Sequence, residues 1–353
     1  MADIQSQHIK MVSRLGKVEV LKKLKFGKYL SGILLVFVLA YIAHTVGKEL
    51  PLIGSTVMAI LLGVLMRNFL TIPVIFDAGI QYSLKKVLKY AIVLLGSSLN
   101  LYQVLIIGGS SLIPIVITVI LGILLTSFVG KRLGLSGNIS PLIGVGTAIC
   151  GATAIATISP IMKAKEEETA YAITTIFIFN VIAVIAYPLI GALVGMPNEI
   201  FGMWAGAAIH DTSSVVAAAF AYSNEAGEVA TVVKLTRTLF LVPLAIIIGV
   251  WVSIKNNKDI NEGSKIKLHK VFPMFLFGFL GMSLLNTVGF FSASTVEVIT
   301  VISKFMILMA MVSVGLSADI KKIRHLGMAP IYTGLFASVL VAVVSIAIIY
   351  LTY

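Results

Sequence analysis

The chain has 353 residues, of which 58% are hydrophobic and 12% are charged, and its mean hydropathy is +1.04. Soluble globular domains are about 45–50% apolar and about 25% charged, so this composition excludes a soluble enzyme or binding module and predicts an all-α polytopic membrane protein. The net charge of +12 does not indicate a nucleic-acid partner, because the Lys and Arg residues gather in short clusters beside apolar stretches, as topology signals do.

Residues 1–28 form a basic segment that we expect to lie in the cytoplasm. The apolar stretch from Tyr29 to Val46 follows it. This stretch is longer than the apolar region of a signal peptide and does not end in a cleavage site of small residues. We therefore expect it to remain as the first membrane helix of a single transmembrane domain that covers residues 29–353.

About eleven apolar segments are long enough to enter a bilayer, and short loops separate them. We predict them at 29–46, 50–66, 84–107, 112–130, 138–161, 168–191, 199–222, 229–254, 271–288, 295–316 and 328–351. The longest internal connection, residues 255–270, is rich in Lys and Asn and is predicted to be cytoplasmic. The acidic run Glu166, Glu167 and Glu168 is interpreted as a solvated turn that favours the start of the next helix.

One pair of segments matches without a gap in the pattern G-x-S-x-[ND]-[LI]-x-x-[VI]-x-x-x-G. Its copies run from Gly96 to Gly108 and from Gly315 to Gly327. The neighbouring basic clusters are expected in the cytoplasm, and this places the two copies in opposite orientations. The pair therefore predicts an inverted-repeat transporter fold.

A second pair matches residues 146–155 with residues 206–215, again without a gap. Full crossings would make these copies parallel and would place Lys163 outside. We therefore predict that 138–161 and 199–222 are broken or re-entrant helices that cross near the membrane centre, with about nine full spans and an external C-terminus. Chance similarity among small residues is the alternative for either pair taken alone.

Small and hydroxyl-bearing residues mark the place where the first broken helix would unwind. They are Gly146, Thr147, Cys150, Gly151 and Thr153. Exposed backbone N–H groups at such a break attract anions, so we predict that these residues bind the solute. Close helix packing through small residues is the alternative.

His210 and Asp211 form an ionisable pair within an apolar segment, which is costly in lipid and typical of a functional site. We predict that Asp211 couples transport to H⁺ or Na⁺. His210, Thr212, Ser213 and Ser214 are predicted to contact the solute. The alternative is that the pair lies in a loop at the membrane surface.

Lys234 and Arg237 are spaced so that they share one face of a helix. We predict that Arg237 binds the anion and that Lys234 takes part in ion coupling. The alternative is that both side chains extend to the lipid headgroups. Asn100, Asn180 and Asp319 are weaker candidates.

The chain resembles the YeiH-type family of bacterial membrane proteins, which are described as sulfate exporters. Four blocks carry the resemblance: residues 144–154, 208–216, 233–238 and 315–320. The family is similar to a wider superfamily of cation/proton antiporters and anion transporters with inverted repeats and paired broken helices. The resemblance implies that Gly146 to Thr153 and Gly206 to Ser214 are the two broken elements.

Together these observations lead to the hypothesis of a secondary transporter for a small, inorganic or organic anion in the bacterial inner membrane. A sulfate-like solute, H⁺ or Na⁺ and the lipid bilayer are the expected partners, no cofactor or metal is expected, and a homodimer is left open. The sequence contains no P-loop, dinucleotide or zinc motif. The alternatives are an intramembrane enzyme that uses His210 and Asp211, a channel, and a membrane scaffold.

Overall fold

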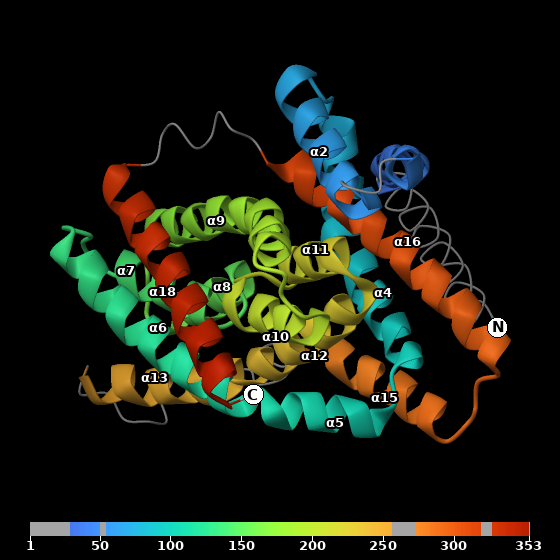
Figure 1. Ribbon diagram of the computed structural model, residues 1–353. Helices are drawn as coiled ribbons and strands as arrows, with labels where there is room; N and C mark the ends of the chain where they lie inside the picture. The colour runs from blue at the N-terminus through green and yellow to red at the C-terminus, as the bar shows by residue number, and fades with distance from the viewer. Residues whose placement is uncertain (1–28, 50–53, 256–272, 319–326, 353) are drawn as a thin grey trace, which may run out of the picture.

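The computed structural model describes residues 29–49, 54–255, 273–318 and 327–352, which fold into helices joined by short loops (Figure 1). The basic segment 1–28, the loop 255–270 beyond Lys255, and Asp319 lie outside the described residues. In chain order the helices are Tyr29–Glu49, α2 (Gly54–Phe69), η1 (Val74–Phe76), α3 (Asp77–Tyr82), η2 (Ser83–Val87), α4 (Leu88–Leu95), η3 (Gly96–Ser98), α5 (Leu101–Ser110), α6 (Leu112–Arg132), α7 (Ile139–Ala148), α8 (Ala152–Ile161), α9 (Glu166–Leu193), α10 (Asn198–Ala208), α11 (Thr212–Tyr222), α12 (Asn224–Leu239), α13 (Leu241–Lys255), α15 (Phe275–Thr287), α16 (Ala293–Ser317) and α18 (Met328–Thr352).

Six of the described helices are long and apolar enough to cross a membrane. They are Tyr29–Glu49, α6, α9, Asn224–Val252, α16 and α18, and a seventh is added if Val74–Ser98 and Leu101–Ser110 count as one bent span. The all-helical membrane architecture is therefore confirmed. Among the described residues, the six or seven candidate spans are fewer than the about nine full spans that we predicted. The difference lies in α2 and α15, which have 16 and 13 residues and are shorter than the about 20 residues that a crossing needs. The predicted segments 138–161 and 199–222 are each divided into two short helices.

The predicted helix 84–107 is bent by 110° after Ser98. The 3₁₀ turn Gly96–Ser98 ends its first part, and Leu99 then adopts an extended conformation. Asn100 begins the second part, because its side chain accepts a hydrogen bond of 2.8 Å from the Tyr102 amide. Two serines and an asparagine favour such local bonds over a continuous helix.

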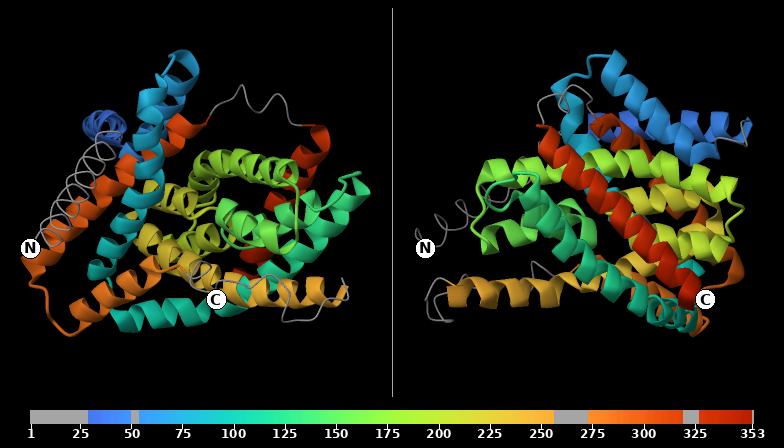
Figure 2. Two further views of the ribbon diagram at one scale, coloured as in Figure 1. Left: turned by 180° about the vertical axis from the view of Figure 1, so that it is seen from behind. Right: turned by 60° about the vertical axis from the view of Figure 1, so that its left-hand side comes forward.

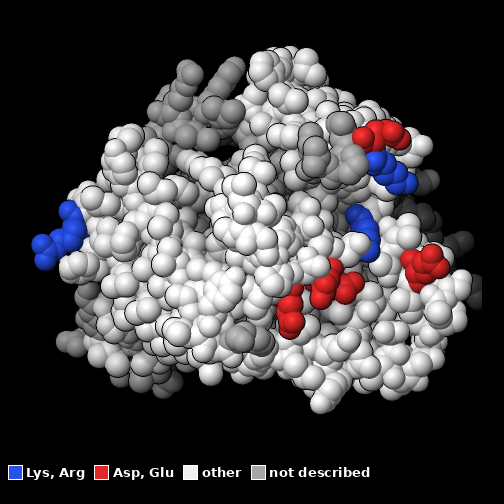
Figure 3. Space-filling model, viewed as in Figure 1, with Lys and Arg blue, Asp and Glu red and all other residues white. Residues whose placement is uncertain are grey.

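The outer surface of the molecule is apolar. Large hydrophobic side chains on the long helices are exposed, among them Phe128, Leu189 and Val343. Figure 3 shows one face on which charged side chains are few and scattered. Lipid tails are the natural environment for such a surface, because water would leave it unfavourably solvated.

Helices α7 and α8 form a hairpin, not a continuous rod. A Cβ atom on Gly146 of α7 would lie 2.7 Å from the Cδ1 atom of Ile155, so α8 folds back against α7. At the open end, Glu168 accepts hydrogen bonds from the Asn138 amide (3.1 Å) and from the Lys165 amide (2.9 Å). Glu168 therefore connects the two ends of the hairpin, whereas the sequence had indicated only a solvated turn.

Helices α10 and α11 form a second hairpin. The rings of Phe201, near the start of α10, and Tyr222, at the end of α11, stack with centroids 3.9 Å apart. The Tyr222 hydroxyl donates to the carbonyl of Met196, and Asn198 Nδ2 donates to Glu225 Oε2 at 3.0 Å. The two ends of this hairpin therefore also meet.

Helix α9 fixes how the hairpins are arranged. It has 28 residues and is about 42 Å long. Glu168, at its first turn, holds the open end of the first hairpin, and the Gly191 carbonyl, near its last turn, lies 3.4 Å from the hydroxyl of Tyr222 in the second. Halfway along, Asn180 contacts the tip of the second hairpin. The hairpins therefore enter from opposite ends of α9, and their tips lie near its middle.

The hairpins lie in the middle of the molecule between two groups of long helices (Figures 1 and 2). Helices α6 and α18 pack on one side, and α2, α4 and α16 pack on the other. Two apolar clusters correspond to these sides, and α11 and α12 contribute residues to both. These two helices therefore link the halves of the structure.

The helix ends fall at equivalent positions in both matched pairs. In the second pair, α7 ends at Ala148 and α10 at the aligned Ala208. In the first pair, helices end at the aligned residues Ser98 and Ser317. The residue patterns thus located real interruptions of the backbone.

We predict that cysteines placed at the open ends of the two hairpins react from opposite sides of the membrane. In a Cys150→Ala background, Lys163→Cys should react with a membrane-impermeant maleimide only from the cytoplasmic side, and Glu199→Cys only from the other side. The measurement compares labelling of right-side-out and inside-out vesicles. Labelling of both positions from the same side would contradict the arrangement along α9.

Candidate functional site at the hairpin junction

The tips of the two hairpins touch each other, and we call this region the hairpin junction. It consists of the loops 149–151 and 209–211 together with Lys234 and Arg237 of α12. A Cβ atom on Gly151 would lie 3.3 Å from the Cβ atom of Asp211. The Asp211 amide donates a hydrogen bond of 3.1 Å to Asn180 Oδ1, which joins the junction to the middle of α9.

Arg237 joins the C-terminal ends of α7 and α10. Its Nε atom donates to the carbonyl of Ala148 at 2.6 Å. Its two terminal nitrogens donate to the carbonyls of Thr147 and Ala207, and one of them also lies 3.3 Å from that of Ile209. The last carbonyls of a helix have no hydrogen-bond donor within the helix, and they carry partial negative charge. The guanidinium group supplies both the donors and a positive charge.

Lys234 makes the same kind of connection one helical turn away. Its ammonium group donates to the carbonyl of Ile149 at 2.7 Å and to that of Ile209 at 2.9 Å. Both cationic side chains are 0% exposed. The alternative that they extend to the lipid headgroups is therefore wrong. Among the described residues, the hydrogen bonds of these two side chains go to the backbone of the hairpins. Direct contact with a solute or coupling ion stays a prediction.

The N-terminal ends of α8 and α11 are treated differently. Asp211 caps α11, since its carboxylate accepts from the Ser213 amide at 2.9 Å and from the Ser213 hydroxyl. The first turn of α8 has no side-chain cap, because its N-cap residue is Gly151. Thr153 in that turn is exposed, and Thr212 in the first turn of α11 is half-buried. The open turn of α8 presents partial positive charge to whatever enters the junction.

His210 points toward α18 and is 3% exposed. Its Nε2 atom lies 2.8 Å from Ser338 Oγ, and the Ser338 hydroxyl donates to the carbonyl of Gly334. Because that hydroxyl hydrogen is already used, Nε2 must be the donor to Ser338. His210 Nδ1 and Thr147 Oγ1 are buried without a hydrogen-bond partner in the described part of the chain.

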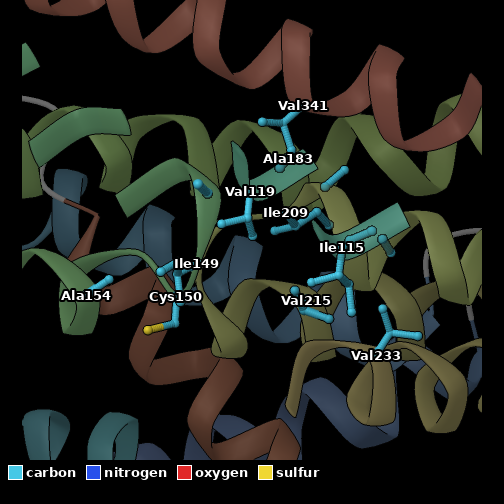
Figure 4. Close-up of a cluster of buried hydrophobic side chains, with 14 of the residues drawn as sticks. Ile115, Val119, Ile149, Cys150, Ala154, Ala183, Ile209, Val215, Val233 and Val341 are labelled. Atoms are coloured by element: carbon cyan, nitrogen blue, oxygen red, sulfur yellow. The ribbon is translucent and has the colours of Figure 1, made fainter. Parts of the chain in front are cut away.

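The remaining predicted residues support the junction from within an apolar cluster. Cys150 is 3% exposed and Ser214 is 2% exposed. Gly146 packs against the side chain of Ile155, as the packing alternative states. Figure 4 shows Ile149 and Cys150 from one tip and Ile209 from the other among the buried apolar side chains. The structure thus brings both predicted broken segments and both cations together at one place.

Two residues near the junction were not among the main site residues that the sequence predicted. Lys89 of α4 lies within range of an electrostatic interaction with Asp211, and it was not a candidate residue in the sequence. Asn180 was a weak candidate because nothing local distinguishes a lone amide in an apolar helix. Asn100 caps α5 and lies outside the junction. Among the described residues, no group of three or more His, Cys, Asp or Glu side chains is placed to hold a metal ion.

Comparison with known proteins shows close relatives over most of the chain. The family described as "Conserved hypothetical protein 698" matches residues 31–334. UPF0324 membrane proteins of Clostridium tetani and Fusobacterium nucleatum are each 38% identical, over 90% of this chain and 96% and 97% of their own lengths. A UPF0324 membrane protein of Streptococcus agalactiae is 38% identical over 88% of this chain and 93% of its own length. No solved structure matches the chain.

We predict that Arg237→Met lowers the free energy of unfolding by about 3 kcal/mol or more, because it leaves carbonyls of both hairpins unpaired at a buried position. Arg237→Lys should lose less, since it keeps the charge but not the planar set of donors. Lys131→Met, at an exposed position on α6, is the control. Denaturation in detergent measures the effect, and equal stability of Arg237→Met and the control would contradict it.

We also predict that Gly151→Ala costs about 1–3 kcal/mol of stability. Its φ of 63° and ψ of −131° are accessible essentially only to glycine, and the added methyl group would press on Asp211. Gly195→Ala is the control, because Gly195 also has a positive φ of 60° but has open space around it. The same unfolding assay compares them. A loss at Gly195 as large as that at Gly151 would show that contact between the tips contributes nothing.

Proposed function

The chain belongs to the "Conserved hypothetical protein 698" family, the UPF0324 membrane proteins, and from that premise we propose that it is a secondary transporter of a small anion. The solute would bind at the hairpin junction, where the unwound tips expose backbone groups. Helix breaks at membrane depth are tolerated where protein encloses them, and in transporters they line the solute site.

The charge balance of the junction carries this proposal. Four half-helix ends meet there, two N-terminal and two C-terminal, so their partial charges of about half a unit cancel. With Lys234 and Arg237 protonated and Asp211 ionised, the formal charges that remain sum to one positive charge. Lys89 adds a further positive charge nearby. An anion at the open first turn of α8 would neutralise the excess.

The placement of the junction supports a site at the membrane centre. The tips lie near the middle of α9, which is long and apolar enough to cross the bilayer. If α9 spans, the two hairpins enter from opposite faces, as an inverted-repeat transporter requires. The YeiH-type resemblance belongs here as well, and it makes a sulfate-like anion the first solute to test.

Coupling to H⁺ or Na⁺ would act through Asp211. One carboxylate oxygen of Asp211 accepts both bonds from Ser213. The other oxygen, Oδ1, has no hydrogen-bond partner among the described residues, so a proton or cation would bind there and neutralise the carboxylate. Binding of the cation and of the anion would then be linked through the charge sum of the junction.

Two features weigh against the enzyme alternative. In a hydrolytic triad the serine donates to the histidine and a carboxylate holds the other ring nitrogen. Here Ser338 donates to Gly334, and His210 Nδ1 has no partner among the described residues. The carboxylate of Asp211 is turned to its own helix, where Ser213 occupies it.

We predict that Asp211→Asn lowers gradient-driven uptake of the anion by about tenfold or more. The measurement uses proteoliposomes with labelled sulfate and a labelled organic sulfonate, with an imposed pH or Na⁺ gradient. Asp77→Asn is the matched control, because Asp77 forms an ion pair of 3.5 Å with Arg67 far from the junction.

Loss of uptake in Asp211→Asn with normal uptake in Asp77→Asn would support the proposal. Uptake that does not depend on the imposed pH or Na⁺ gradient would indicate a channel instead. A chemically changed solute in detergent, without any gradient, would indicate an enzyme. No uptake of any anion by the folded wild-type protein would overturn the proposal.

A further inference from the structure

A cavity with polar and apolar lining residues lies away from the hairpin junction. It has a volume of about 360 Å³ and lies between the helix Tyr29–Glu49, α2, the end of α11, the start of α12 and α16. None of its lining residues belongs to the junction. It borders the open end of the α10–α11 hairpin, because Phe220 and Asn224 flank Tyr222.

The cavity lining combines polar and apolar side chains. Its polar residues are His44, Ser55, Thr56, Asn224 and Lys304. Its largest apolar side chains are Phe220, Phe305 and Leu308. Binding sites for small organic molecules combine these two kinds of surface in the same way, with a few polar groups that orient the ligand.

Lys304 gives the lining of the cavity a positive charge. It lies near the middle of the 25-residue helix α16, where an ionisable side chain within a membrane span is costly and marks a functional site. Its ammonium group has neither an ion-pair nor a hydrogen-bond partner among the residues that the structure describes. Glu228 interacts electrostatically with Lys304, but its carboxylate accepts a hydrogen bond of 3.2 Å from the Ser98 hydroxyl and does not line the cavity.

We propose that this cavity binds a small organic anion, a carboxylate or sulfonate with a short apolar body. The charged end would pair with Lys304, with the hydroxyl of Thr56 and the side-chain amide of Asn224 as further donors. The apolar body would lie against Phe220 and Leu308. The volume is at the lower end of the range for organic ligands, about 300–1,000 Å³, and exceeds what a bare inorganic anion fills.

The binding step stands independently of transport. The cavity could also bind the solute before the solute reaches the junction, and this further role rests on the proposed function. In that role the cavity would select organic over inorganic anions, because an inorganic anion makes no contact with its apolar side chains.

The test is isothermal titration of the purified chain in detergent with propanesulfonate, inorganic sulfate and choline at equal ionic strength. Propanesulfonate should bind more tightly than sulfate, and choline should not bind. Lys304→Gln should weaken propanesulfonate binding about tenfold or more, whereas Lys304→Arg should stay within about threefold of wild type. Lys131→Gln, exposed and outside the cavity, should bind like wild type.

A second variant, Thr56→Trp, keeps the charge but fills the cavity and should also abolish binding. Undiminished binding in folded Lys304→Gln or Thr56→Trp would overturn the proposal, as would equal affinity for sulfate or no binding of propanesulfonate. Asp211→Asn separates the two sites. Binding that persists in this variant while uptake is lost supports the cavity, and binding that is lost there but survives in Lys304→Gln places the ligand at the junction.

Discussion

The structure depends on the bonds between the cations of one helix and the carbonyls of two hairpins. Broken helices leave their last carbonyls without partners, and at a buried position no water is available to replace them. Lys234 and Arg237 of α12 satisfy those carbonyls in both hairpins at once. Without them the tips would carry unpaired backbone groups in an apolar cluster. The position of each tip, the contact of Gly151 with Asp211 and the charge of the junction all follow from this connection.

Much of the junction could be predicted from the sequence because its residues are unusual in a membrane segment. The gapless match of 146–155 with 206–215 located both helix breaks, and the ionisable residues His210 and Asp211 marked a tip. The depth of Lys234 and Arg237 could not be predicted, since spacing alone does not distinguish burial from extension to the headgroups. The hydrogen bond from Asn138 to Glu168 could not be predicted either, because the two residues are 30 positions apart in the sequence. The number of full spans was overestimated because hydropathy marks the apolar stretches of α2 and α15 but does not show that their helices are too short to cross.

Helices α11 and α12 have a double role in the packing. They contribute to the apolar cluster around the hairpins and to the cluster that contains α2 and α16. Because α12 holds both tips, the hairpins would move together with it in any rearrangement against α2 and α16. Such a rearrangement would change the cavity beside Lys304, which lies between the same two parts. Alternating access by motion of one bundle against another is consistent with this arrangement.

The order of the residues along the chain has a consequence for biogenesis. The carbonyls that Lys234 and Arg237 hold lie 85 to 90 residues earlier in the first hairpin and 25 to 30 residues earlier in the second. During synthesis both hairpins therefore emerge before the helix that satisfies their tips. Until α12 is inserted, the nascent tips need shelter from lipid, which a translocon or chaperone interior can provide. The helix that completes the junction is also poorly suited to insert alone, since two cations oppose its entry. Insertion of α12 and closure of the junction are thus best understood as a single cooperative step.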